Sequence, residues 1–274
     1  MFTTPRNRCL IVGVLNCTPD SFSDGGRFKD SADAVAAGLA MVEAGADWLD
    51  VGGESTRPGA VPVAVEEEIR RVVPVIGALA ARLGARARLS IDTYKAETAG
   101  AALAAGATVV NDISGGLLEP GLLPVAAAAG AGIVVGHLRG APATMMNGVS
   151  FVNVVSEVIV ELRERVAAAR AAGCSEIWAD PGIGFGKQLE HNLALLRELP
   201  TLCREIGVPL MLGVSRKAFL GQITGKPASE RLFATAAAVS VAVWGGASAV
   251  RVHDVAAMRD AVLVANAIRC RTHE

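Results

Sequence analysis

The sequence lacks an excess of charge of either sign. Its 26 lysines and arginines are matched by 27 aspartates and glutamates, which gives a formal net charge of −1. Proteins that hold nucleic acid or an anionic membrane surface carry a clustered positive excess, so we expect neither partner here. A small basic pocket that binds an anion is compatible with this balance.

Cysteine pairs and long apolar runs are absent as well. The 5 cysteines are odd in number, and no two have the C-x-x-C spacing of a metal or redox site. This pattern favours reduced thiols in a cytoplasmic protein. No run of about 18 consecutive apolar residues is present, and the apolar run at residues 9–15 is shorter than a secretory signal core usually is. We therefore expect no membrane span and no signal peptide.

Aromatic residues make up only 4% of the chain, whereas hydrophobic residues reach 51% and charged residues 19%. Such a composition excludes intrinsic disorder. Abundant small aliphatic residues suit closely packed layers of helices on strands. A length of 274 residues suits one α/β barrel, and we expect residues 1–274 to form a single domain.

Short apolar runs alternate with longer amphipathic segments along the chain. Each run is rich in Val, Ile and Leu and lacks polar alternation, which is typical of parallel strands buried on both faces. The expected strands are residues 10–15, 48–51, 88–91, 108–110, 132–136, 176–179, 209–213 and 249–252.

The segments between these runs have the periodicity of helices. All but the last stop at a Gly, which favours the left-handed backbone that ends a helix. The expected helices are residues 31–44, 65–83, 95–105, 120–129, 154–172, 190–206, 229–244 and 255–271. Eight strands in strict alternation with eight helices predict a closed (β/α)8 TIM barrel, with an open doubly wound sheet as the alternative.

Polar residues gather where the predicted strands end, which is where a barrel of this kind builds its active site. Asp92, Asn111 and Asp180 follow or end the third, fourth and sixth strands, and each could instead cap a helix. Arg251 and His253 are two positions apart on the last strand, so we expect them to point the same way and form an anion site. The charged run at residues 66–71 is expected to be a solvated helix face.

The polar segments also carry a resemblance to a known family. In chain order they are NCTPDSFSDGG, GGESTRPG, SIDTYK, NDISGG, DPGIGFGK, SRKAFLG and RVHD, and they resemble dihydropteroate synthases from Leu10 to Asp254. The family fold is the barrel predicted above. Its members join 6-hydroxymethyl-7,8-dihydropterin diphosphate to 4-aminobenzoate and release diphosphate in folate biosynthesis. The resemblance further implies a homodimer and inhibition by sulfonamides.

The resemblance also implies a role for each motif residue. The pterin would be bound by Asp92, Asn111, Asp180, Phe185 and Lys217. The 4-aminobenzoate would be enclosed by Phe22, Thr56, Arg57, Pro58, Ser215 and Lys217. The diphosphate would be held by Asn16, Arg251 and His253, with Mg²⁺ on Asn16 as the metal cofactor. The residues implied to be catalytic, around an SN1-like pterin cation, are Asp24, Asp92, Asp180 and Lys217.

Three other functions remain open at this point. A related barrel that transfers methyl groups from a folate would share the Asp and Asn set but has no need for the Ser215–Lys217 motif or the Arg251 and His253 pair. A Schiff-base aldolase would use Lys217 as its nucleophile. A non-catalytic pterin-binding relative would bind the ligand without turnover.

Overall fold

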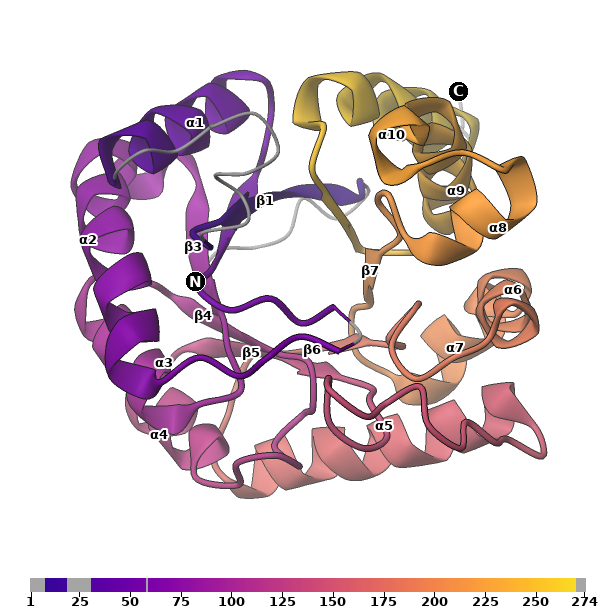
Figure 1. The fold of residues 1–274 in the computed structure, drawn as a ribbon, viewed down its shortest axis with the longest axis horizontal. Coiled ribbons are helices and arrows are strands. Elements are labelled where there is room, and N and C mark those ends of the chain that lie inside the picture. The colour runs from indigo at the N-terminus through magenta and orange to yellow at the C-terminus, as the bar shows by residue number, and fades with distance from the viewer. Residues whose placement is uncertain (1–7, 19–30, 58, 270–274) are drawn as a thin grey trace, which may run out of the picture.

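A computed structural model describes residues 8–18, 31–57 and 59–269 of the chain. Its strands form a ring of eight, with helices on the outside (Figure 1). The strands are β1 (Leu10–Asn16), β2 (Trp48–Gly52), β3 (Arg88–Asp92), β4 (Val109–Asp112), β5 (Gly132–Gly136), β6 (Ile177–Asp180), β7 (Met211–Gly213) and β8 (Ala249–Val252).

The ring closes in the order expected of a TIM barrel. The strands are joined in the order β6-β5-β4-β3-β2-β1-β8-β7, and all the pairs are parallel. The two ends of that order meet through a parallel bridge between Ala179 and Leu210. The predicted closed barrel is confirmed, and the open sheet is excluded.

Helices cover the barrel between successive strands (Figure 1). They are α1 (Ser31–Glu43), α2 (Val65–Leu83), α3 (Ala96–Ala104), α4 (Leu122–Ala128), α5 (Val154–Ala171), α6 (Leu189–Arg197), α7 (Leu199–Ile206), α8 (Ala218–Thr224), α9 (Leu232–Trp244) and α10 (Val255–Arg269), with short 3₁₀ turns at Gly84–Arg86 and Ala228–Glu230. Within the described residues, no helix is both long enough and apolar enough to cross a bilayer.

The helix predictions fail at three places. The helix expected over residues 190–206 is broken into α6 and α7, because Pro200 stands in the first turn of α7 and cannot continue a preceding helix. Helix α8 was not predicted, and α9 begins later than expected because a 3₁₀ turn precedes it. Gly245 ends α9 with a φ of −70°, so the left-handed turn expected there falls instead on Gly246, at a φ of +106°.

The interior of the barrel is filled at the end where the strands begin. Trp48 and Trp178 meet edge to face there, with ring centroids 5.8 Å apart. The Arg88 guanidinium lies 5.3 Å from the Trp48 ring, and Arg88 Nη2 donates to Glu176 Oε2 at 3.0 Å. Since described side chains fill this end of the barrel, we expect a ligand to approach the barrel axis from the opposite mouth.

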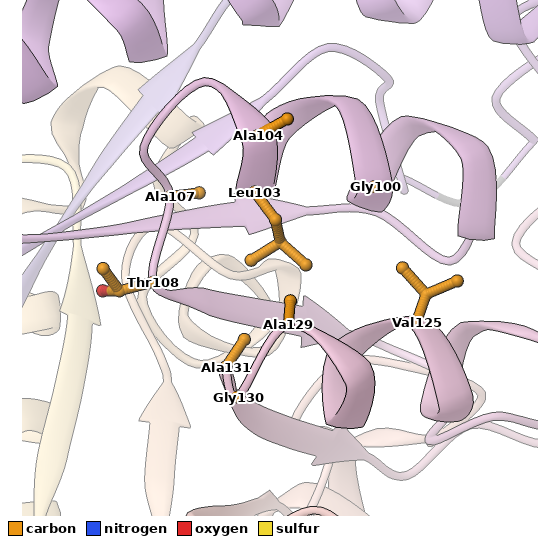
Figure 2. A pocket seen from close by; sticks show the side chains of 9 residues that line it. All are labelled: Gly100, Leu103, Ala104, Ala107, Thr108, Val125, Ala129, Gly130 and Ala131. Atoms are coloured by element: carbon orange, nitrogen blue, oxygen red, sulfur yellow. The ribbon is translucent and has the colours of Figure 1, made fainter.

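A hollow on the outer surface lies between α3 and α4 and has a volume of about 380 Å³ (Figure 2). Its lining is formed by Gly100, Leu103, Ala104, Ala107, Thr108, Val125, Ala129, Gly130 and Ala131. Thr108 brings the one polar side chain of that lining, so the hollow offers no group for acid–base or nucleophilic chemistry.

Candidate active site at the barrel mouth

Carboxylates, an amide and a guanidinium converge where β2, β3, β4 and β8 end. Asp92 and Asn111 are register partners on neighbouring strands, so their side chains lie side by side. From β8, Arg251 donates through Nε to Asp50 Oδ2 at 2.5 Å and through Nη2 to Asp92 Oδ2 at 2.6 Å. Asn111 Nδ2 also donates to Asp50 Oδ2, at 2.9 Å. One guanidinium thus links two buried carboxylates on adjacent strands.

A pocket opens above this network. It is lined by Thr56, Asp92, Asn111, Ile113, Gly136, His137, Asp180, Gly182, Phe185, Gly213, Lys217 and Arg251. Every residue predicted to bind the pterin is in this lining, together with Thr56 and Arg251. The structure therefore brings side chains that are far apart in sequence into one cavity.

Burial shifts the ionisation of the charged groups in the pocket. It raises the pKa of Asp92 to about 7, although Arg251 opposes that change. Burial also raises the pKa of Asp180, whose Oδ1 accepts a hydrogen bond from Gly182 N at 2.7 Å. The pKa of Lys217 falls to about 8 because of burial, opposed by Asp180. Titratable groups poised near neutrality in one cavity are typical of functional sites.

Lys217 and Phe185 form one wall of the pocket. The Lys217 Nζ lies 3.9 Å from the centroid of the Phe185 ring, which is a cation–π contact. The loop that carries Phe185 passes close to the residue that follows β5. At Gly182 the backbone has a φ of +69°, and a Cβ on this residue would lie only 2.0 Å from His137 O. Only glycine fits this crossing.

Ser215 and His253 lie together at the edge formed by β7 and β8. His253 Nδ1 is 3.0 Å from Ser215 Oγ, and His253 N donates to the same oxygen at 3.3 Å. Burial lowers the pKa of His253 to about 3, so the ring is neutral near pH 7. The predicted 4-aminobenzoate residue and the predicted diphosphate residue are therefore direct neighbours, although both lie outside the pocket lining.

Asn16 stands at the end of β1, and Gly52 of β2 lies between it and Asp92 of β3. A Cβ on Gly52 would lie 3.5 Å from Asp92 Oδ2 and 3.8 Å from Asn16 Oδ1, so both oxygens border the space above that glycine. No cluster of three or more His, Cys, Asp or Glu side chains that could hold a metal occurs in the described part of the chain. The amide oxygen of Asn16 is a hard donor that suits Mg²⁺, but one such ligand binds the ion weakly. Asn16 therefore fits a Mg²⁺ whose other ligands are phosphate and water oxygens.

Several predicted residues are not brought into the pocket. Arg57 is exposed and, like Asn16, does not line it. Phe22, Asp24 and Pro58 lie outside the described residues, so their roles stay predictions.

Three residues of the site were not among those predicted from the sequence. Asp50 lies at the centre of the network, and its signal was a carboxylate inside the apolar strand Trp48–Gly52. His137 lines the pocket, and its Nδ1 lies 2.9 Å from the Nζ of buried Lys187. Burial lowers the pKa of Lys187 to about 7. His137 directly follows β5, and Lys187 lies in the loop after β6. Their position after a strand end was the sequence signal that could have identified them.

Known proteins share this fold and these motifs. Residues 12–253 match the family described as pterin binding enzyme. The chain is 46% identical to the dihydropteroate synthase of Synechocystis, over 95% of this chain and 90% of that relative. The Yersinia pestis dihydropteroate synthase in a sulfonamide drug complex superposes with a TM-score of 0.90 at 39% identity, covering 96% of this chain and 94% of that one. The Xanthomonas albilineans dihydropteroate synthase with 4-aminobenzoic acid gives 0.88 at 44% identity, with the same coverage.

The barrel and the polar mouth define the class of this protein as a pterin-binding enzyme on a TIM-barrel fold. The similarity over nearly the whole chain is more specific than that class. The chain belongs to the dihydropteroate synthase family, which confirms the resemblance and the enzyme class predicted from the motifs.

Proposed function

We propose that this chain joins 6-hydroxymethyl-7,8-dihydropterin diphosphate to 4-aminobenzoate and releases 7,8-dihydropteroate and diphosphate, as a single-domain enzyme of folate biosynthesis. The grouping of Asp92, Asn111, Asp180, Phe185 and Lys217 in one pocket carries the proposal. The pterin edge donates from its 2-amino group and ring N–H, which two carboxylates accept. Its carbonyl accepts from an ammonium, which Lys217 supplies.

The diphosphate binds beside this pocket. The Arg251 guanidinium donates to Asp50 and to Asp92, and these two hydrogen bonds fix its orientation at the barrel mouth. It and His253 bind the phosphate oxygens, and the charge that develops on the leaving group is stabilised there. Asn16 would hold a Mg²⁺, which would add further charge neutralisation to the diphosphate.

The reaction needs no strong general base. The C–O bond to diphosphate breaks, and the electron-rich dihydropterin delocalises the positive charge that remains. Asp92 and Asp180 stabilise that cation, and the family motif assigns Asp24 to the same role. The unprotonated amine of 4-aminobenzoate then forms the new C–N bond and loses a proton. Thr56 and Lys217 line the pocket on the side proposed for its ring. The family motifs also assign Phe22, Arg57 and Pro58 to that ring and Ser215 to its carboxylate, a site that sulfonamides would share.

Helices α9 and α10 support the proposal of a homodimer. The two helices pack against each other, and each exposes large apolar side chains. These are Phe233, Val241 and Trp244 on α9 and Leu263, Val264 and Ile268 on α10. Large contiguous apolar surfaces on a protein usually mark an interface. The four described cysteines are free thiols, which supports a cytoplasmic location.

The test is turnover with the two substrates and Mg²⁺, followed as dihydropteroate formed and diphosphate released. We expect activity that is lost without Mg²⁺ and falls by at least about 100-fold in Lys217→Ala. Pterin binding without turnover would instead indicate the methyltransferase relative or a non-catalytic protein, and absence of pterin binding would contradict the proposal altogether.

A further inference from the structure

Arg216 has an unusual backbone conformation. Among the described residues it is the one non-glycine residue with a positive φ, at 56°. This left-handed region is disfavoured for a residue with a side chain, because Cβ approaches the neighbouring carbonyl oxygen. Arg216 stands between Ser215 and Lys217, both predicted to contact substrate, so the strained turn lies inside the site.

Three side chains from outside the turn, those of Asp254, Thr235 and Arg231, hold it in place. Arg216 Nε and Nη2 donate to Asp254 Oδ2 and Oδ1 at 3.0 and 2.6 Å. Arg216 N donates to Oγ1 of the buried Thr235 at 3.1 Å. Arg231 Nη1 donates to Arg216 O at 3.0 Å and to Lys217 O at 3.3 Å. Strained backbone persists where its surroundings over-determine it, as they do here.

The turn sends its two neighbours in different directions. Ser215 Oγ lies 3.0 Å from His253 Nδ1, whereas Lys217 Nζ lies 3.9 Å from the Phe185 ring centroid. Asp254 directly follows His253 in the chain, so the ion pair and the Ser215–His253 contact form two adjacent links between the β7 and β8 loops.

We propose that Arg216 and Asp254 are positioning residues, whose ion pair holds the left-handed turn that directs Lys217 into the pocket and Ser215 toward His253. Neither residue lines the pocket, whereas Lys217, which they hold, does. This inference rests on the proposed function and adds to it the residues that set the distance between the pterin end and the diphosphate end of the site.

The first test removes the charge of Asp254 without changing its size. We expect Asp254→Asn to lower kcat/KM by about 10- to 100-fold, because small displacements of a reacting group cost that much. Asp254→Glu, which keeps the charge, should restore part of the rate. Arg216→Gly, which adopts the same φ without strain but lacks the ion pair, should fold and lose a similar factor, so a folding defect in one variant does not decide the outcome.

Arg8→Met is the matched control. Arg8 and Asp47 form a similar two-point pair, with side-chain exposures of 43% and 21% against 33% and 25% for Arg216 and Asp254. Arg8 precedes β1 and Asp47 precedes β2, so this pair lies at the opposite end of the barrel. We expect Arg8→Met to leave kcat/KM within about twofold of the unchanged protein, as surface pairs contribute little.

A double-mutant cycle separates positioning from general structural support. We expect the effect of Asp254→Asn on the dissociation constant of 6-hydroxymethylpterin, measured by fluorescence, to shrink to about twofold or less in a Lys217→Ala background, because Lys217 is the pterin-side group that the turn directs into the pocket. A full, additive effect in that background overturns the inference, as does unchanged kcat/KM in Asp254→Asn. If the unchanged protein binds the pterin without turnover, the proposed function fails, and the binding cycle alone decides the inference.

Discussion

The ionisation states of individual side chains at the barrel mouth determine the pH range in which the site can be active. The Lys217 ammonium faces the Phe185 ring on one side and the charges of Asp92 and Asp180 on the other. Burial lowers its pKa, while the two carboxylates stabilise its charge. Arg251 limits the rise in the pKa of Asp92 in the same way. The charges of this pocket therefore depend on one another, and a change at one alters the protonation of the rest.

This coupling predicts a narrow pH profile. The Asp92 carboxyl loses its proton as the pH rises through about 7, and Lys217 loses its charge as the pH rises through about 8. Because an ionised Asp92 and a charged Lys217 are both needed, kcat/KM should rise through the first value and fall through the second. Lys217→Arg keeps its charge and should remove the fall at high pH. An unchanged alkaline limb in that variant would show that another group titrates there.

At the scale of elements, a buried ion cluster joins α2 to the segments after β2 and β3. The Lys95 Nζ donates to Glu54 Oε2 at 2.6 Å, to Glu68 Oε2 at 2.7 Å and to Val63 O at 2.6 Å. Tyr94 OH donates to Glu54 Oε1 at 2.8 Å. The prediction that residues 66–71 form a solvated face is wrong at Glu68, which is only 1% exposed, because its partner comes from a different segment.

Removing the lysine of this cluster should destabilise the fold. Lys95→Met leaves the Glu68 carboxylate buried without its counter-charge, and we expect the free energy of unfolding to fall by about 3–5 kcal/mol. Denaturant unfolding measures this change. Adding Glu68→Gln removes one of the two buried carboxylate charges that Lys95 paired, Glu54 being the other, so the double variant should regain part of the loss. If the double variant is no more stable than Lys95→Met, the ion pair is not the cause.

For the whole molecule, the apolar surface of α9 and α10 is the feature that the barrel does not bury. Helix α9 is apolar around most of its circumference, although only one face packs on the barrel. A helix of this composition is normally covered on all sides. Phe233, Val241 and Trp244 are exposed on α9, which packs against α10, and the proposed dimer would cover them.

A charge placed on that surface should separate the proposed dimer. We expect the unchanged protein to have twice the monomer mass in light scattering and Trp244→Glu to have the monomer mass, because a carboxylate would lose its water in the interface. Val152→Glu is the control, since Val152 is fully exposed in the segment before α5. A monomer in the unchanged protein, or a dimer in Trp244→Glu, contradicts an interface at Trp244.

The sequence alone determined the alternation of strands and helices and the positions of the polar strand ends. These features follow from local hydrophobic periodicity and from glycines that end helices, such as Gly207 with its φ of +73°. The site motifs Asp92, Asn111 and Asp180 were visible for the same reason, because each directly follows or ends an apolar run.

Which of those residues meet depends on the folding of the whole chain into the barrel. Asp50 lies at the centre of the site because Arg251, 201 positions away on β8, donates to its carboxylate. Glu68 was buried by Lys95, and Arg216 was held in a left-handed turn by Asp254, Thr235 and Arg231. Each of these outcomes depends on partners distant in sequence, whose distance and orientation are set by the closure of the eight-stranded ring and not by any local pattern.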